Sequence, residues 1–334
     1  MIGWFGMVRM LWCGLEKARG DNARMLANIS AADLSRRLRK LAHVFDVPGI
    51  QREPLAAEQV AAYYDNCHDA YRKYHSAEGA VHMALNDGQR FDADGFYGQL
   101  RRIELRWATP PQQVLELGYG QGFNIAYLAQ RHARCSFAGI DLSSAHVAIA
   151  RQRVHSLALA NVQLVQGDFH QLPFASASFD EVICIESFCH ASDPARALAE
   201  VARVLRPGGR FTLFDGYLVQ PPERLLADEA LAVSLVARGL AIVGLQVQDE
   251  LIAAARSAGL QLAQLAVLDT QVLPSLRRLE RVTGAVIRFA WLGRRALARR
   301  HPAHGRNVLA GYLMRCTVEM GLIGYREIVL VKQQ

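Results

Sequence analysis

Short apolar runs alternate with segments of helical pattern through the middle of the chain. The apolar runs have the length and composition of buried strands, and they occupy residues 113–117, 135–140, 162–166, 180–185 and 210–214. Helical patterns lie between or after these runs, at residues 123–132, 144–156 and 194–205. Such alternation predicts a doubly wound α/β sheet whose ligand site lies at the carboxyl ends of the strands.

Two more strands are predicted near the C-terminus, at residues 259–268 and 325–332, with helical patterns in between. The intervening residues are far too many for a hairpin connection, so we expect a helical cap inserted between strands six and seven. The predicted domains are a helical N-terminal extension covering the site (1–110), the sheet core (111–269 plus 323–334) and the basic cap (270–322).

The N-terminal extension begins with an apolar, aromatic stretch at residues 1–15, which Arg9 interrupts. It is too short to cross a bilayer, and two interpretations stay open: a helix packed on the protein or a second subunit, or a shallow membrane-surface anchor. Ser30 and Asp33 then form a capping pattern for a basic helix over 31–44. Pro54 suits the first turn of the following helix.

The amino-acid composition indicates a globular protein and the redox state of its compartment. The hydrophobic content of 51% is that of a globular protein with a buried core. The six cysteines are scattered and form no Cys-x-x-Cys pair, so the sequence favours neither a disulfide framework nor a zinc site. We therefore expect a protein of the reducing cytoplasm.

Positive charge is concentrated in the predicted cap. Residues 271–306 contain nine arginines and one acidic residue, a balance of +8, which leaves about −1 for the rest of a chain with net charge +7. Three interpretations compete: a solvated face, a nucleic-acid surface, or a lid that binds an anionic substrate or leans on an anionic membrane. Aromatic residues are sparse there and no RNA-binding module is visible, so we expect no nucleic-acid partner.

A glycine-rich turn, Gly118-x-Gly120-x-Gly122, follows the first strand directly and leads into a helix. Backbone in such a turn can approach a ligand closely, although glycines also serve turns for structural reasons alone. Asp141 ends the second strand, 23 residues after Gly118, where a carboxylate can accept both hydroxyls of a ribose. The third glycine comes one residue too early for the nicotinamide fingerprint, which argues against a hydride carrier.

Together these motifs resemble class I S-adenosylmethionine-dependent methyltransferases over about residues 112–216. The matching segments are Glu116-Leu-Gly-x-Gly-x-Gly122, Asp141, Gly167-Asp168, Leu172-Pro173-Phe174, Phe179-Asp180 and Leu205-Arg-Pro-Gly-Gly209. The resemblance implies a Rossmann-like methyltransferase sheet and S-adenosylmethionine as cofactor. It places Glu116, Gly118, Gly120 and Gly122 at the methionine part, Asp141 at the ribose, and Asp168 with Phe169 at the adenine. Asn124 and Leu142 complete the expected cofactor-binding set.

Aromatic residues mark the helix predicted over 55–74. Tyr64, His68 and Tyr71 share one face at i, i+4 and i+7, which is commonly just a half-buried stripe. The segment Tyr64-Asp65-x(5)-Tyr71 is also similar to one that closes over the methyl group in sterol- and tocopherol-type methyltransferases. The resemblance implies a catalytic role for Tyr64 and Tyr71 and acceptor contacts for Tyr63 and His68. The Trp-Gly that usually follows is missing, and His82 is a counterpart of a histidine found there.

The segment after the fourth strand, Glu186-Ser-Phe-Cys-His190-Ala, resembles the Glu-Ala-Thr-Cys-His-Ala of sterol C-methyltransferases. Prenyl diphosphate C-methyltransferases also have a glutamate at this strand end. Methyl transfer to an alkene leaves a carbocation, which a carboxylate can stabilise and deprotonate, aided by aromatic faces such as Phe188. Glu186 is therefore the predicted base and His190 the alternative. A purely structural or cofactor-binding hydrogen bond of Glu186 stays open.

We therefore expect a C-methyltransferase of an isoprenoid in terpene biosynthesis, most simply of a prenyl diphosphate such as farnesyl diphosphate. Arg294 and Arg295 would bind the diphosphate, because arginine suits bidentate contacts to phosphate oxygens. Mg²⁺ would accompany such a substrate, although the sequence shows no dedicated metal cluster. The alternatives are a sterol or quinone acceptor, O- or N-methylation of a natural product, and a non-catalytic binding protein. Peripheral membrane contact and a homodimer are further expectations.

Overall fold

Seven strands form one sheet in the order β3-β2-β1-β4-β5-β7-β6. They are β1 (Gln113–Leu117), β2 (Ser136–Asp141), β3 (Val162–Gln166), β4 (Phe179–Ile185), β5 (Leu205–Leu218), β6 (Leu260–Val267) and β7 (Ile323–Lys332). The first five pair in parallel, whereas β7 runs antiparallel to both β5 and β6. The structure, a computed structural model, describes residues 29–53, 58–298 and 301–333, so the predictions for residues 1–15 and for Pro54 lie outside the described residues.

Helices cover both faces of the sheet, because successive side chains of a strand point to opposite faces and both faces are apolar. Leu115 and Leu117 of β1 join one core with α8 (Pro194–Val204) and α10 (Gln248–Ser257), while Val114 joins another with α5 (Gly98–Glu104) and α6 (Phe123–Arg131). The helix α7 (Ser144–Ser156) packs beside β3. This arrangement confirms the predicted Rossmann-like sheet.

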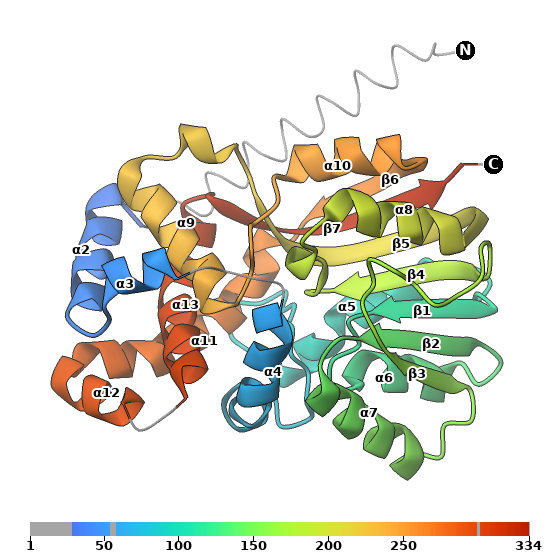
Figure 1. Cartoon of the computed structure of the whole chain (residues 1–334), viewed down its shortest axis with the longest axis horizontal. Coiled ribbons are helices and arrows are strands. Elements are labelled where there is room, and N and C mark those ends of the chain that lie inside the picture. The colour runs from blue at the N-terminus through green and yellow to red at the C-terminus, as the bar shows by residue number, and fades with distance from the viewer. Residues whose placement is uncertain (1–28, 54–57, 299–300, 334) are drawn as a thin grey trace.

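A second layer of helices lies beyond the carboxyl ends of the parallel strands (Figure 1). Its members are α2 (Ala31–Ala42), α3 (Val47–Arg52), α9 (Ala227–Gly239), α11 (Asp269–Arg288), α12 (Ala290–Leu297) and α13 (Pro302–Glu319). The last three follow β6 and precede β7 in the chain, and α13 packs on both α9 and α11. The capping box predicted for α2 is present, because Ser30 and Asp33 exchange hydrogen bonds.

The predicted aromatic helix changes from α-helical to π-helical geometry near its end. It comprises α4 (Glu58–Ala70), which packs on α7 and α13, and then a π-helical turn η1 (Tyr71–His75). Three short 3-10 turns complete the elements: η2 (Ala93–Tyr97), η3 (Phe188–His190) and η4 (Pro222–Arg224). In the described part of the chain, no helix is both long enough and apolar enough to cross a bilayer.

Candidate active site

The glycine turn brings backbone to the carboxyl edge of the sheet. Gly118, Gly120 and Gly122 have φ of +67°, +53° and +74°, in the left-handed region that glycine adopts without strain. A Cβ on Gly118 would lie 2.4 Å from Cβ of Ser187, so no larger residue fits between these two strand ends. Gly122 instead faces α7, since its Cβ would lie 3.0 Å from Cβ of Ala150. The turn therefore leaves an open cradle in front of β1.

A cavity of about 100 Å³ lies at this cradle, and we name it the cofactor cavity. Six predicted cofactor-binding residues line it: Gly118, Gly120, Asp141, Leu142, Asp168 and Phe169. Oδ2 of Asp141 accepts a 2.8 Å hydrogen bond from the amide of Gly120, and Oδ1 accepts one of 2.9 Å from the amide of Ser143. These bonds fix the Asp141 carboxylate at the end of β2, where a ribose would be recognised.

Glu116 and Asn124 lie below the cradle and do not line the cavity. Nδ2 of Asn124 donates a 2.9 Å hydrogen bond to Oε1 of Glu116, and Nε2 of His82 lies 3.0 Å from Oδ1 of Asn124. Oε2 of Glu116 is buried without a hydrogen-bond partner among the described residues, and burial raises the pKa of this carboxyl group to about 8. A buried, unpartnered carboxylate oxygen fits the ammonium group of a methionine-type cofactor.

Glu186 follows β4 with φ of +50°, which is rare for a residue with a side chain. It lines both the cofactor cavity and a second cavity of about 100 Å³, which we name the acceptor cavity. Oε1 of Glu186 accepts hydrogen bonds of 2.7 Å from the amide of Met83 and 2.7 Å from the hydroxyl of Tyr325. Burial nevertheless raises the pKa of Glu186 to about 8.

Aromatic and imidazole groups complete the junction of these two cavities. The hydroxyl of Tyr64 lies 2.8 Å from Nε2 of His190, and both residues line both cavities. Burial lowers the pKa of His190 to about 4, so its imidazole is neutral near pH 7 and able to accept a proton. Asp215 also lines the acceptor cavity, and burial raises its pKa to about 6.

An outer chamber of about 360 Å³ adjoins the acceptor cavity between η1, α11 and α13. The two spaces share four lining residues: Tyr71, Met83, Leu240 and Met314. The other residues that line the chamber are Tyr74, His75, Leu279, Val282, Thr283, Val286, Leu297, His304, Asn307, Val308 and Gly311. Neither space is lined by an arginine or a lysine of the described residues. An elongated apolar acceptor suits such a space better than an anionic one.

Five predicted substrate-binding residues line none of these three spaces. Phe188 is fully buried in the sheet core against Phe211, and Tyr63 is buried with its hydroxyl donating to Oδ1 of Asn307. His68 lies half-exposed, with Nδ1 2.9 Å from the carbonyl oxygen of Asp65. The side chains of Arg294 and Arg295 are exposed on α12. The structure thus places Phe188 in the core and the two arginines on the surface, outside the lining of the three spaces.

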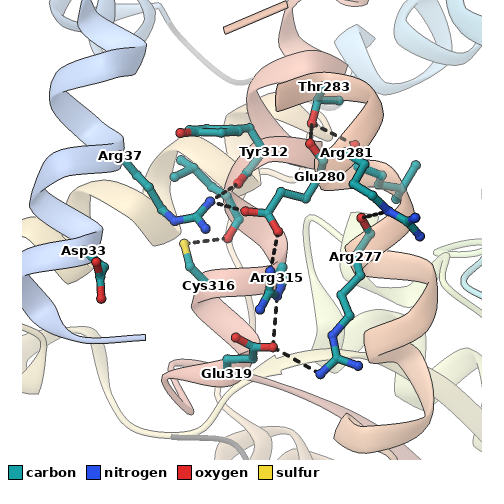
Figure 2. Close-up of polar contacts among 12 residues, drawn as sticks. Asp33, Arg37, Arg277, Glu280, Arg281, Thr283, Tyr312, Arg315, Cys316 and Glu319 are labelled. Atoms are coloured by element: carbon teal, nitrogen blue, oxygen red, sulfur yellow. Dashed lines mark hydrogen bonds and ion pairs between the residues drawn. The ribbon is translucent and has the colours of Figure 1, made fainter. Parts of the chain in front are cut away.

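Part of the arginine-rich cap forms a structural ion-pair network. Figure 2 shows Arg37 of α2 and Arg315 of α13 meeting Glu280 of α11, while Arg315 also reaches Glu319 at 2.9 Å. Arg277 approaches the same Glu319 at 3.7 Å. These contacts tie the N-terminal extension to the inserted helices, and Arg277 of the charge run takes part in them.

Sequence reasoning missed several polar residues that line the two cavities, among them Ser143, His146, Asp215 and Tyr325. Ser143 and His146 lie at the start of α7, immediately after Asp141. Their closeness in sequence to a predicted cofactor-binding residue could have identified them from the sequence. Tyr325 begins β7, and the start of an antiparallel strand lies at the same edge as the ends of parallel strands. Tyr325 could therefore be assigned to the site only once the antiparallel position of β7 in the sheet was known.

Comparison with known proteins defines the class. Residues 115–213 match a family model described as a methyltransferase domain. The chain therefore contains a methyltransferase domain, and the predicted class of S-adenosylmethionine-dependent methyltransferases is confirmed at the level of this domain.

The individual relatives are methyltransferases named for different acceptors. The chain is 40% identical over 123 residues to a fatty-acid O-methyltransferase of Mycolicibacterium smegmatis, covering 36% of this chain and 44% of the relative. It is 30% identical over 177 residues to 24-methylenesterol C-methyltransferase 2 of Oryza sativa subsp. japonica, covering 53% and 48%. The chain thus spans less than half the length of these relatives.

Among solved structures, a geranyl diphosphate methyltransferase in complex with GPP and sinefungin shares the fold. Its TM-score is 0.66 at 17% identity, over 84% of this chain and 99% of that chain. At this sequence identity the similarity shows a shared fold and says nothing about the acceptor molecule. The relatives therefore include enzymes named for carbon and for oxygen methylation, and the chemistry must be argued from this site.

Proposed function

We propose that the protein is an S-adenosylmethionine-dependent C-methyltransferase that methylates an alkene carbon of an uncharged isoprenoid lipid. The observation that carries this proposal is the position of Glu186, a half-buried residue that lines both the cofactor cavity and the acceptor cavity. Methyl transfer to oxygen or nitrogen needs a base for an acidic proton, whereas transfer to an alkene needs an anion beside a carbocation. A desolvated carboxyl group at this junction supports the second chemistry.

S-adenosylmethionine would supply the methyl group, held by the cradle, Asp141 and the free oxygen of Glu116. As the alkene attacks, a carbon–carbon bond forms and the sulfur–methyl bond breaks, which leaves a positive charge on the neighbouring acceptor carbon. Glu186 stabilises this charge and takes the proton from the adjacent carbon, while the ring faces of Tyr64 and Tyr71 add cation–π attraction. A positive charge beside Glu186 also favours its ionised form, opposing the effect of burial on its pKa.

The lining of the acceptor cavity and outer chamber supports an uncharged acceptor. The described lining residues include no arginine or lysine, and burial lowers the pKa of His75 to about 4, which keeps its imidazole neutral. A diphosphate would lose its hydration there without gaining a cationic partner. The prenyl diphosphate expected from the arginines, and the Mg²⁺ that would accompany it, therefore have less support than a sterol- or quinone-like acceptor. A cytoplasmic location and a homodimer stay predictions.

One observation favours a second function. His190 is a neutral imidazole 2.8 Å from the hydroxyl of Tyr64, an arrangement that could deprotonate an acceptor hydroxyl for O-methylation. The chain is also similar to a protein named as a fatty-acid O-methyltransferase, so a related domain is named for methylation of oxygen. In that case His190 would be the base and Glu186 would be structural.

The two functions are distinguished by the product. The purified protein should be incubated with S-adenosylmethionine carrying a labelled methyl group and with sterols, quinones, prenyl alcohols, prenyl diphosphates, phenols and fatty acids. We expect label on a carbon of an uncharged isoprenoid, located by mass spectrometry and NMR. A methyl ether or ester as the main product would overturn the proposal in favour of the second function. Binding of the cofactor without turnover on any acceptor would favour a non-catalytic binding protein.

A further inference from the structure

The outer chamber opens beside an exposed apolar surface at the end of the cap. Two residues that line the chamber, Tyr74 and Val282, have 46% and 48% of their surface exposed, so they form part of its mouth. A few residues after Val282 in the sequence, Phe289 and Trp291 have 57% and 71% of their surface exposed. Large apolar side chains gathered in this way commonly mark an interaction surface.

Unpaired positive charges surround these apolar residues. Arg281, Arg288, Arg294 and Arg295 are exposed, and among the described residues none of them lies in a salt bridge. Residues 281–298 contain no acidic residue. Other cap arginines are engaged: Arg277 approaches Glu319, and Arg278 donates to two backbone carbonyl groups. Arg281 donates a hydrogen bond to the carbonyl oxygen of Arg277, and Arg288 lies over the ring of Phe289. No carboxylate of the described residues forms a salt bridge with these outward arginines, so their positive charge stays available at the surface.

The chamber and this surface are parts of the same helices. Leu297 of α12 lines the chamber, while Trp291 of the same helix is exposed to solvent, and Val286 lines the chamber two residues before Arg288. Figure 1 shows α12 at the end of the molecule away from the sheet, where it can meet a broad surface. Tryptophan favours the boundary between lipid and water, and arginine is attracted to anionic lipid head groups.

We propose that the end of α11 and helix α12 form a docking surface for an anionic membrane, defined by Arg281, Arg288, Phe289, Trp291, Arg294 and Arg295. Docking turns the mouth of the outer chamber towards the lipid, so that an apolar acceptor passes from the bilayer into the chamber without crossing water. The passage of the acceptor rests on the proposed function, whereas binding to the membrane does not. The outward arginines thus recognise the membrane that holds the acceptor and not the acceptor itself.

Membrane binding can be measured without cofactor or acceptor. The full-length protein is sedimented with vesicles of phosphatidylcholine alone and of phosphatidylcholine mixed with phosphatidylserine. We expect binding to the mixed vesicles that weakens as salt is added, because each arginine near the surface contributes roughly fivefold to the partition coefficient. The combined variant Arg288→Glu, Arg294→Glu, Arg295→Glu should lower partitioning by a factor of at least about 100. Trp291→Ala should weaken it in both low and high salt.

A matched variant controls for net charge. Arg134, Arg151 and Arg256 are exposed on the sheet domain, and their combined change to glutamate alters the charge equally but away from α12. This control should keep most of the vesicle binding. Both variants should bind S-adenosylmethionine, measured by calorimetry, as the wild-type protein does, which shows that they are folded.

Three results would overturn the proposal. The first is vesicle binding that is absent, or equal for the α12 variant and the wild-type protein. The second is a change from dimer to monomer in the α12 variant, measured by light scattering, which would assign this surface to a second copy of the chain. The third is salt-sensitive binding to RNA in preference to vesicles. Because none of these readouts involves methyl transfer, a failure of the proposed reaction leaves the membrane test intact.

Discussion

The hydroxyl of Tyr325 donates a 2.7 Å hydrogen bond to Oε1 of Glu186, and it also lies 3.1 Å from Nε2 of Gln99. The same Gln99 nitrogen donates to the carbonyl of Met83, whose amide donates to Oε1 of Glu186. A closed ring of hydrogen bonds therefore fixes one oxygen of the predicted base. It connects the start of β7 with a loop of the N-terminal extension, two segments far apart in the chain.

Removal of the Tyr325 hydroxyl should move the acidic limb of the pH–rate profile. The hydrogen bond lowers the pKa of Glu186 against the larger effect of burial, so Tyr325→Phe should raise that pKa further. A base must be ionised, and we therefore expect the acidic limb to move to higher pH by about one unit. Tyr217→Phe is the matched control, because the buried Tyr217 hydroxyl has no hydrogen-bond partner in the part of the chain that the structure describes. Equal profiles for both variants would show that Tyr325 does not act on the base.

Substitution of the base itself tests the reaction. Glu186→Gln keeps the size of the side chain but removes its charge, and we expect the rate of C-methylation to fall by roughly 10²- to 10⁴-fold. Single-turnover measurements on the best acceptor would show the fall in the chemical step. His190→Gln should have a much smaller effect if the carboxylate is the base. The reverse ranking of the two variants would assign catalysis to His190.

Glu116 gives a prediction for stability. Burial raises its pKa to about 8, above the value of ~4.3 for a glutamate in an unfolded chain. The folded protein therefore holds a proton that the unfolded chain loses, so the contribution of Glu116 to stability is full below pH ~4.3 and is lost as the pH rises through its folded pKa. Glu116→Gln removes this dependence. We expect the variant to gain at least ~1 kcal/mol relative to the wild-type protein as the pH rises through that window.

Urea unfolding at a series of pH values measures this difference directly. The exposed Glu250 offers a control, because Glu250→Gln should leave the pH dependence unchanged. In the same proteins, Glu116→Gln should weaken S-adenosylmethionine binding at least ~10-fold, because the ammonium group of the cofactor loses its anionic partner. Unaltered cofactor affinity would mean that the free oxygen of Glu116 does not meet the ammonium group.

The ion-pair network of the cap should matter for stability and not for chemistry. Glu280 is 13% exposed and meets both Arg37 and Arg315, so Glu280→Gln removes the carboxylate that pairs with Arg37 and one of the two that pair with Arg315. We expect a loss of about 1–3 kcal/mol in the free energy of unfolding, measured by urea denaturation. The exposed Glu223 serves as control, since Glu223→Gln should change stability by less than ~0.5 kcal/mol.

The sequence predicted features whose signals are local. The strand at 113–117, the glycine turn and the acidic residue at the end of β2 lie close together in the chain, and the structure places all three as expected. Tyr325 and Gln99 could not be found in this way. The contact of Tyr325 with Glu186, and that of Gln99 with Tyr325, depend on the packing of β7 and α5. The arginine run was equally ambiguous, since a count of charges does not reveal which side chains face inward. Only helix packing separates Arg277, beside Glu319, from Arg294 on the surface.

Filling the outer chamber should separate long acceptors from short ones. Val308 of α13 is half-buried and lines the chamber away from Glu186, so Val308→Trp fills space that a long apolar tail would occupy. For a long acceptor we expect kcat/KM to fall at least ~10-fold, because the lost burial of about two methylene groups corresponds to more than ~1.4 kcal/mol. A short acceptor that reaches only the acceptor cavity should react at an unchanged rate. Val243 is exposed and lines none of the three spaces, so Val243→Trp controls for the added ring. If both tryptophan variants methylate long and short acceptors equally well, the chamber does not hold the acceptor tail.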